Sequence, residues 1–130
     1  MSPHEHSLLM TWEFGGTSSD YDEINQLIDS SKLYFPNQLH RLFTHNTFFI
    51  SICERIFGMY IINSDGLEIP VRRICEEHIK QDHNGFLPTI QDWIKELDVR
   101  LPHKDSWVRT PRKIDLNKLK EYYDKQKNNI

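Results

Sequence analysis

The 130-residue sequence lacks the short motifs of several common enzyme and metal-binding classes. Its only cysteines, Cys53 and Cys75, form no C-x-x-C pair, which argues against a thiolate zinc site and a redox motif. It contains no G-x-G-x-x-G or G-x-x-x-x-G-K-[S/T] phosphate loop, no G-x-S-x-G elbow and no H-E-x-x-H pair. We therefore interpret the two cysteines as buried, reduced thiols.

Long apolar runs are absent as well. No stretch approaches the roughly 18 residues that a membrane-spanning helix needs. Residues 1–14 carry two glutamates and lack the basic segment of a secretory signal, so we expect a cytoplasmic protein. Hydrophobic residues make up 38% of the chain and charged residues 27%, which is enough apolar content for one modest core.

Charge is distributed unevenly along the chain. Residues 1–107 hold 9 Lys and Arg against 16 Asp and Glu, a net charge of −7, whereas residues 108–130 hold 7 against 3, a net charge of +4. We predict one globular helical domain over 1–107 and a basic C-terminal extension over 108–130. Only the extension could attract nucleic acid, through Arg109, Arg112, Lys113, Lys118 and Lys120. The alternative is a solvated helix that packs on the acidic domain.

Helix start and stop signals predict a mainly α fold of the α+β class, with one small hairpin. Ser2, Pro3 and Glu5 form a capping box, and Gly15 can end the helix that follows it. Helices are predicted over residues 3–14, 20–32, 36–57, 72–82 and 90–97, with a basic helix over 116–127 and a β-hairpin over about 59–71.

Two of the predicted helices place histidines and carboxylates in register. In the long helix, His40 and Glu54 fall within about 40° of each other on a polar stripe, whereas His45 points toward apolar neighbours. In the next helix, His78 and Asp82 are four residues apart on the apolar face that a soluble helix buries. A buried carboxylate needs a partner, which His78 or a metal ion could supply.

The functional hypothesis brings these side chains together in one site. The candidate metal ligands are His6, His40, His45, Glu54, His78 and Asp82. Such residues hold zinc, iron or manganese, and an open coordination position would let the metal acidify water for phosphoester hydrolysis, with Glu54, His78 and Asp82 as catalytic groups. The structural alternative is a helix-end hydrogen bond between His78 and Asp82, a satisfied core His45 and a solvent-facing stripe.

A series of short segments resembles a family of small bacterial and phage proteins known only as a domain of unknown function. The matching segments are His6, Phe14-Gly15-Gly16, Asp20-Tyr21, Asp29 to Lys32, His40-Arg41, His45, Glu54, Phe57-Gly58, Asn63 to Gly66, Pro70 to Arg72, Glu76, His78, Asp82, Pro88-Thr89 and Asp92-Trp93. The resemblance spans about residues 4–107. Asn25 and Asn46 stand where the family pattern leads us to expect histidine. The resemblance supports the choice of residues and implies no reaction.

Two other classes of function stay open at this stage. A small acidic protein of phage type could be a non-enzymatic interaction protein that inhibits a host defence complex by covering its surface. The basic extension could instead make the chain an accessory module for nucleic acid.

Overall fold

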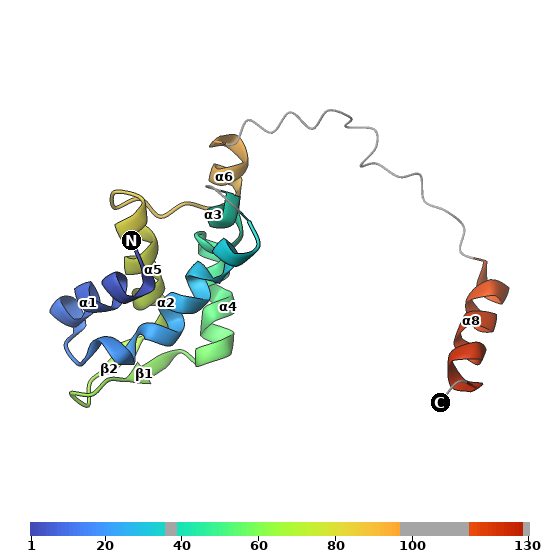
Figure 1. The fold of residues 1–130 in the computed structure, drawn as a ribbon, viewed down its shortest axis with the longest axis horizontal. Coiled ribbons are helices and arrows are strands. Elements are labelled where there is room, and N and C mark those ends of the chain that lie inside the picture. The colour runs from blue at the N-terminus through green and yellow to red at the C-terminus, as the bar shows by residue number, and fades with distance from the viewer. Residues whose placement is uncertain (36–38, 97–114, 129–130) are drawn as a thin grey trace. The chain divides into compact units, whose positions relative to one another are not determined.

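A computed structural model describes residues 1–35, 39–96 and 115–128 of the chain. The chain divides into two compact units, residues 1–99 and 100–130, each of which is described by itself. The first unit is mainly helical and has a small antiparallel hairpin, which confirms the predicted fold class (Figure 1). The predicted boundary at residue 107 lies outside the described residues.

The first unit alternates short helices and turns around the hairpin. Its helices are α1 (Pro3–Phe14), α2 (Asp22–Asp29), α3 (Leu39–Thr44), α4 (Thr47–Phe57), α5 (Val71–Asp82) and α6 (Ile90–Glu96), with 3-10 turns η1 (Ser18–Asp20) and η2 (Ser30–Leu33). Strands β1 (Tyr60–Ile62) and β2 (Glu68–Pro70) pair in antiparallel fashion, with Ile61 opposite Ile69.

Most helix ends lie where the sequence places them. The Ser2–Glu5 capping box is present at the start of α1, and Gly15 ends that helix at a φ of 78°. Gly58 ends α4 at a φ of 92°. These two glycines combine a positive φ with a ψ near ±180°, a backbone region that essentially only glycine enters.

The prediction of one long helix over 36–57 is wrong, because the chain breaks after α3. Asn46 adopts an extended conformation and caps both helices: its side-chain oxygen accepts from the Phe49 N–H at 2.8 Å. Its amide nitrogen donates to the carbonyl oxygens of Leu42 and Phe43. The break replaces helical hydrogen bonds with side-chain bonds. It also cancels the helical-wheel relation between His40 and Glu54.

The apolar core lies where α1, α2, α4 and α5 pack together. Its buried residues are Met10, Tyr21, Ile24, Ile28, Ile50, Cys53, Ile69, Val71, Ile74, Cys75 and Ile79. Each large apolar side chain buried in this way stabilises the fold by roughly 1.5–3 kcal/mol. The hydrogen bond with Cys53, together with burial, raises the pKa of Cys75, so the Cys75 thiol stays protonated.

Polar side chains and backbone groups connect the hairpin turn to the loop after α1 by hydrogen bonds. We call this group the hairpin clasp (Gly16, Thr17, Asp20, Ser64 and Asp65). Asp20 Oδ2 accepts from the backbone N–H groups of Thr17 at 2.8 Å and Ser64 at 2.9 Å. Asp65 Oδ2 accepts from the Gly16 N–H at 2.8 Å. Asp20 therefore serves the turn, and α2 begins at Asp22 rather than at residue 20 as predicted.

The described part of the second unit is the helix α8 (Leu116–Asn128). Asp115 caps it by accepting from the N–H groups of Asn117 and Lys118, and the helix covers the predicted basic segment 116–127. All of its side chains are exposed. Within the described residues, no helix of either unit has the length and apolar content needed to cross a membrane.

Candidate metal centre

Two aspartates and two histidines meet inside the first unit. Asp29 ends α2, His45 lies between α3 and α4, and His78 and Asp82 are one turn apart on α5. One ligand atom from each of these four residues lies within 4.8 Å of the others. Three segments that are distant in sequence thus deliver two imidazoles and two carboxylates to one point, and this group could hold a metal ion. We call these four residues the metal centre.

The inward atoms of the metal centre are the Nε2 nitrogens and the carboxylate oxygens. His45 Nε2 lies 2.9 Å from Asp82 Oδ2 and 3.4 Å from Asp29 Oδ1. His78 Nε2 lies 3.2 Å from Asp29 Oδ1 and 3.5 Å from Asp82 Oδ2. The carboxylates are 3% and 5% exposed and both imidazoles are fully buried, so water contributes little to their solvation.

His6 of α1 approaches the centre from one side. Its Nε2 lies 3.2 Å from Asp82 Oδ1, the oxygen that the other two imidazoles leave free. Its ring stacks on that of His78 at a centroid distance of 3.7 Å. His6 thus lies against the metal centre without being one of its four residues.

The Nδ1 atom of His78, which is the ring nitrogen away from the carboxylates, has a hydrogen-bond acceptor of its own. His78 Nδ1 lies 2.8 Å from Asn25 Oδ1 on α2. The orientation of the Asn25 amide follows from its other end, because its nitrogen donates to Ser7 Oγ, whose single proton goes to the Pro3 carbonyl. His78 Nδ1 must therefore carry a hydrogen, which leaves the Nε2 lone pair directed at the carboxylates.

The other two imidazoles also have outer partners. His6 Nδ1 lies 2.7 Å from Gln81 Oε1. His45 Nδ1 lies 3.1 Å from Thr44 Oγ1, and the Thr44 hydroxyl in turn donates toward the His40 carbonyl and lies 3.0 Å from Ser31 Oγ. In metalloproteins, outer partners of this kind fix the tautomer and orientation of a ligating imidazole.

The arrangement leaves buried polar atoms that no neighbour satisfies. Within the described ranges, His6 Nε2 and Asp29 Oδ2 are buried without a hydrogen-bond partner, although Lys32 Nζ approaches the latter to 3.4 Å. An Nε2 lone pair and a carboxylate oxygen are both acceptors, so their approach requires a proton or a cation between them. The donor set therefore fits a bound cation.

The pKa values of the two aspartates keep the centre anionic. Burial by itself raises the pKa of Asp82, but the close approach of the His45, His6 and His78 imidazoles outweighs it and holds that pKa well below its usual value. Burial likewise raises the pKa of Asp29, and the approach of His45 and His78 outweighs it, so the pKa of Asp29 is lowered too. Both groups are ionised at neutral pH, as metal binding requires.

A pocket of about 540 Å³ opens beside the centre between α5 and α6. Asp82 and His83 line it on the α5 side, and Trp93 lines it on the α6 side. The Trp93 indole N–H donates to the His45 carbonyl at 2.7 Å, which fixes the position of α6 relative to the centre. Asp82 is therefore both a member of the metal centre and part of the pocket wall.

Of the six predicted ligands, the structure brings His45, His78 and Asp82 together and places His6 beside them. His40 packs edge-on against His45 at 5.4 Å, but its own Nδ1 is buried without a partner among the described residues. Burial, followed by the charge of His45, lowers the pKa of His40 to about 4. Glu54 is not part of the centre: it forms an ion pair with Arg72 at 2.8 Å.

The sequence interpretation did not include Asp29 among the candidate ligands. The signal was available, because Asn25 and Asp29 are polar residues four apart on the buried face of α2, next to Ile24 and Ile28. The same spacing singled out His78 and Asp82 on α5. His83, which follows Asp82 and has a buried Nε2 without a partner in the described part of the chain, was also missed.

Comparison with known proteins places the chain without assigning it a reaction. No curated protein and no solved structure matches it. Residues 1–107 match a family described as a domain of unknown function, DUF6915. That match contains every residue of the metal centre and stops before α8. The chain belongs to the DUF6915 family.

Proposed function

We propose that the chain binds one divalent transition-metal ion through Asp29, His45, His78 and Asp82 and uses it to hydrolyse a phosphoester. One observation carries the proposal. Two buried imidazoles face two buried carboxylates through Nε2, while their Nδ1 atoms have partners of their own. A divalent cation at this point would meet ligands on every side and balance the two negative charges.

The competing explanation is a set of protonated imidazoles. Because His78 Nδ1 is bound to Asn25 Oδ1, a proton on its Nε2 as well would make the ring cationic. That ring is fully buried and stacks on His6 at 3.7 Å, so an added charge there would lose the solvation that water gives it. A divalent ion would balance both carboxylates without a charge on His78, which favours the metal.

The ligand types narrow the choice of metal. Imidazole nitrogens with carboxylate oxygens suit zinc, iron and manganese, and the two cysteines lie in the apolar core and are not part of the centre. When bound, such an ion lowers the pKa of water toward about 7 and so supplies a nucleophile at neutral pH. The pocket at Asp82 gives a substrate access to this point, while Asn25, Thr44 and Gln81 hold the imidazoles in place.

Elemental analysis tests the metal proposal. Protein purified without a nickel column should take up about one equivalent of zinc or manganese. Less than about 0.2 equivalents of any transition metal, before and after addition of zinc and manganese, would reject the proposal. Glu54→Gln is the matched control. Glu54 is a largely buried carboxylate that pairs with Arg72, so this substitution should not change the metal stoichiometry.

The hydrolase proposal needs a separate measurement. Metal-loaded protein should release nitrophenol from bis(4-nitrophenyl) phosphate, and chelation should stop the release. Asp82→Asn should also abolish it. Stoichiometric metal binding without hydrolysis of any phosphomonoester or phosphodiester would reduce the function to metal binding.

A second candidate function, protein interaction, is favoured by exposed apolar side chains at η2 and α3. Leu33 is 83% exposed and Tyr34 77% exposed, and Phe35 and Phe43 stack on each other at 4.4 Å near the surface. Such patches are typical of contact surfaces. If the chain forms a stable complex with a partner protein, and the His40→Ala and His78→Ala variants still form it, protein interaction would be favoured over the metal-dependent function.

A further inference from the structure

His6 Nε2 is a buried ring nitrogen that has no hydrogen-bond partner among the residues that the structure describes. It lies 3.2 Å from Asp82 Oδ1. At the same distance of 3.2 Å, His78 Nε2 is hydrogen-bonded to Asp29 Oδ1. The His6 pair therefore differs in direction rather than in distance, because the oxygen does not lie where a hydrogen on the ring nitrogen would point. A hydrogen on His6 Nε2 would leave this pair poorly satisfied.

The spacing of these two atoms fits two ligands of one cation. Imidazole nitrogen and carboxylate oxygen bind zinc at about 2.0–2.2 Å, so neighbouring ligands of one ion lie roughly 3.0–3.4 Å apart. His6 Nδ1 lies 2.7 Å from Gln81 Oε1. With that oxygen as its acceptor, Nδ1 carries the ring hydrogen and the lone pair of Nε2 is available. Gln81 thus has the position of the outer partner that orients a ligating histidine.

This cation would be a different ion from the one in the metal centre. His6 is not among the four residues whose ligand atoms lie within 4.8 Å of one another. The imidazoles of the centre approach Asp82 through Oδ2, at 2.9 Å from His45 and 3.5 Å from His78, whereas His6 faces Oδ1. A carboxylate can bind one ion through each of its oxygens. The position of Asp82 therefore suits a bridge between two ions.

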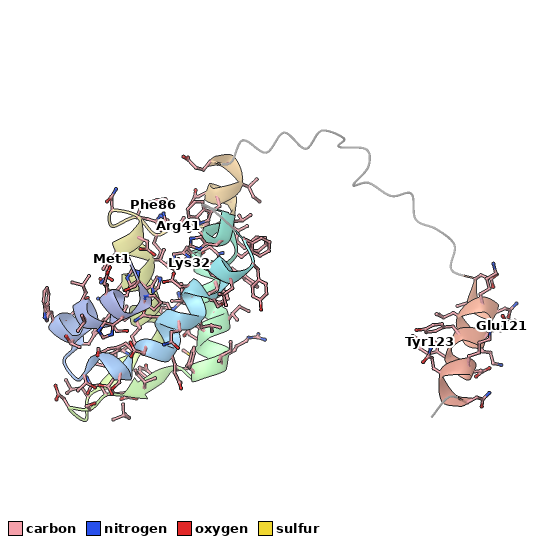
Figure 2. All side chains as sticks on the ribbon, viewed as in Figure 1. Met1, Lys32, Arg41, Phe86, Glu121 and Tyr123 are labelled. Carbon is pink, nitrogen blue, oxygen red and sulfur yellow. The ribbon has the colours of Figure 1, made fainter. Side chains whose placement is uncertain are left out.

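The start of α1 gives this side of Asp82 access to solvent. The Met1 amino group approaches Asp82 Oδ1 to 3.9 Å, which is beyond hydrogen-bond distance, and Met1 is exposed. Its approach leaves His6 Nε2 without a partner in the described part of the chain. Figure 2 shows Met1 and Lys32 at the same end of the unit, and Lys32 Nζ lies 3.5 Å from the Met1 carbonyl oxygen. An ion can therefore reach Oδ1 by displacing an exposed residue rather than part of the core.

We propose that His6 Nε2 and Asp82 Oδ1 bind a second divalent metal ion, so that Asp82 bridges it to the ion of the metal centre. The proposal rests on the proposed function, because it adds a second ion to the same site. Asp29 and Asp82 balance the charge of the first ion, so the second adds positive charge that an anionic substrate would balance. In two-metal sites, ions about 3.5–4 Å apart stabilise the attacking and leaving oxygens of a phosphoryl group. The substrate would then be a phosphoester whose phosphoryl oxygens bind both ions.

Titration with manganese, followed by calorimetry and by electron paramagnetic resonance, tests the second site. The unsubstituted chain should bind about one equivalent at low free manganese and about two at higher concentration. The second equivalent should produce the spin-coupled signal of two ions that share a carboxylate. His6→Gln should lose the second equivalent and the coupled signal and keep the first equivalent. His4→Gln is the matched control, because His4 is an exposed histidine of the same helix, and it should bind both ions.

The outcomes separate the second site from the metal proposal. About one equivalent in the unsubstituted chain at saturating manganese would overturn the second site and leave the metal centre standing. A second equivalent retained by His6→Gln would overturn the assignment to His6. A single equivalent whose affinity falls in His6→Gln would make His6 a further ligand of the first ion and overturn the bridge. Binding of neither manganese nor zinc would overturn the proposed function, and the second site with it.

His6→Phe provides a second variant, because it removes the ligand nitrogen and keeps a ring that can stack on His78. Thermal unfolding followed by circular dichroism establishes whether each variant is folded before titration. The coupled manganese signal is measured on the unsubstituted chain. Its absence when the second equivalent is bound would therefore overturn the bridge even if neither variant folds.

Discussion

The first unit contains two carboxylate pairs, and they are satisfied in opposite ways. In the hairpin clasp, Asp20 and Asp65 accept from backbone N–H groups, which carry a hydrogen at every pH. In the metal centre, Asp29 and Asp82 face imidazole Nε2 atoms, which carry a hydrogen only when the ring is protonated or the other tautomer forms.

This difference separates a structural carboxylate from a functional one. The clasp is complete within the chain, and the bonds from Ser64 and Thr17 lower the pKa of Asp20 without any ion. Asp29 receives no such donor from His78, whose Nδ1 already donates to Asn25, so this contact needs a further proton or a metal ion. Carboxylates that lack permanent donors are thus the better guide to a ligand site than acidic residues as such.

The largest expected effect comes from the same substitution made in each pair. Asp82→Asn removes one ligand charge and should lower zinc affinity by more than about 100-fold. Asp20→Asn should leave zinc affinity unchanged and act on stability alone. Competition with a chromogenic chelator measures both. Similar zinc affinities for the two variants would remove the distinction between the centre and the clasp.

The next largest effect is expected from the hydrogen bond by which Asn25 orients the His78 imidazole. Asn25→Ala removes the acceptor that fixes His78 and should lower zinc affinity about 10- to 100-fold without removing a ligand. Gln26→Ala, at the adjacent exposed position of α2, is the control and should change nothing. An Asn25→Ala protein with full zinc affinity would show that the tautomer of His78 is set by other groups.

Acid should act on His40, which packs against the centre, before it acts on the clasp. The pKa of His40 is about 4 in the folded chain and about 6.5 in the unfolded chain. Between these pH values the unfolded chain binds more protons than the folded chain, so the free energy of unfolding decreases as the pH is lowered. Metal-free protein should lose about 2 kcal/mol between pH 7 and pH 4.5 from His40 alone. The lowered pKa of Asp20 keeps the clasp intact over this range. Urea unfolding at several pH values measures the slope, and His40→Gln should reduce it.

The smallest expected effect tests the close packing of the clasp. Gly16 has a φ of 71°, and a Cβ atom there would lie 2.4 Å from Asp20 Oδ2. Gly66 has a φ of 79° and open space around it, so Gly66→Ala carries the backbone strain without the clash. Gly16→Ala should be less stable than Gly66→Ala by about 1–2 kcal/mol, with zinc affinity intact. Equal unfolding midpoints would mean that the clasp can relax.

Local signals in the sequence predicted most of the fold and part of the site. Capping residues and glycines located the ends of α1, α4 and α8, and four-residue spacing on an apolar face identified His78 with Asp82. These features depend on neighbours within one helical turn, which a single sequence contains.

The features that the sequence did not predict are decided by tertiary contacts, because the local sequence pattern fits more than one structure. Asn46 lies in a continuous helical pattern without proline or glycine, and only tertiary packing makes it a double cap. The straight-helix assumption then grouped His40 with Glu54, although Glu54 pairs with Arg72 from α5. Asp29 joins the centre through contacts with residues 16 and 49 positions away, a relation that periodicity does not reveal.

The bond from Trp93 to the His45 carbonyl gives the protein an internal optical probe. The ring centroids of Trp93 and His83 lie 5.0 Å apart, and the indole N–H is bound to the backbone of His45, a residue of the metal centre. Trp12, by comparison, is 84% exposed and reports mainly on solvent. Fluorescence quenching by a paramagnetic ion such as manganese, but not by zinc, can therefore follow occupancy of the centre in real time without any attached label.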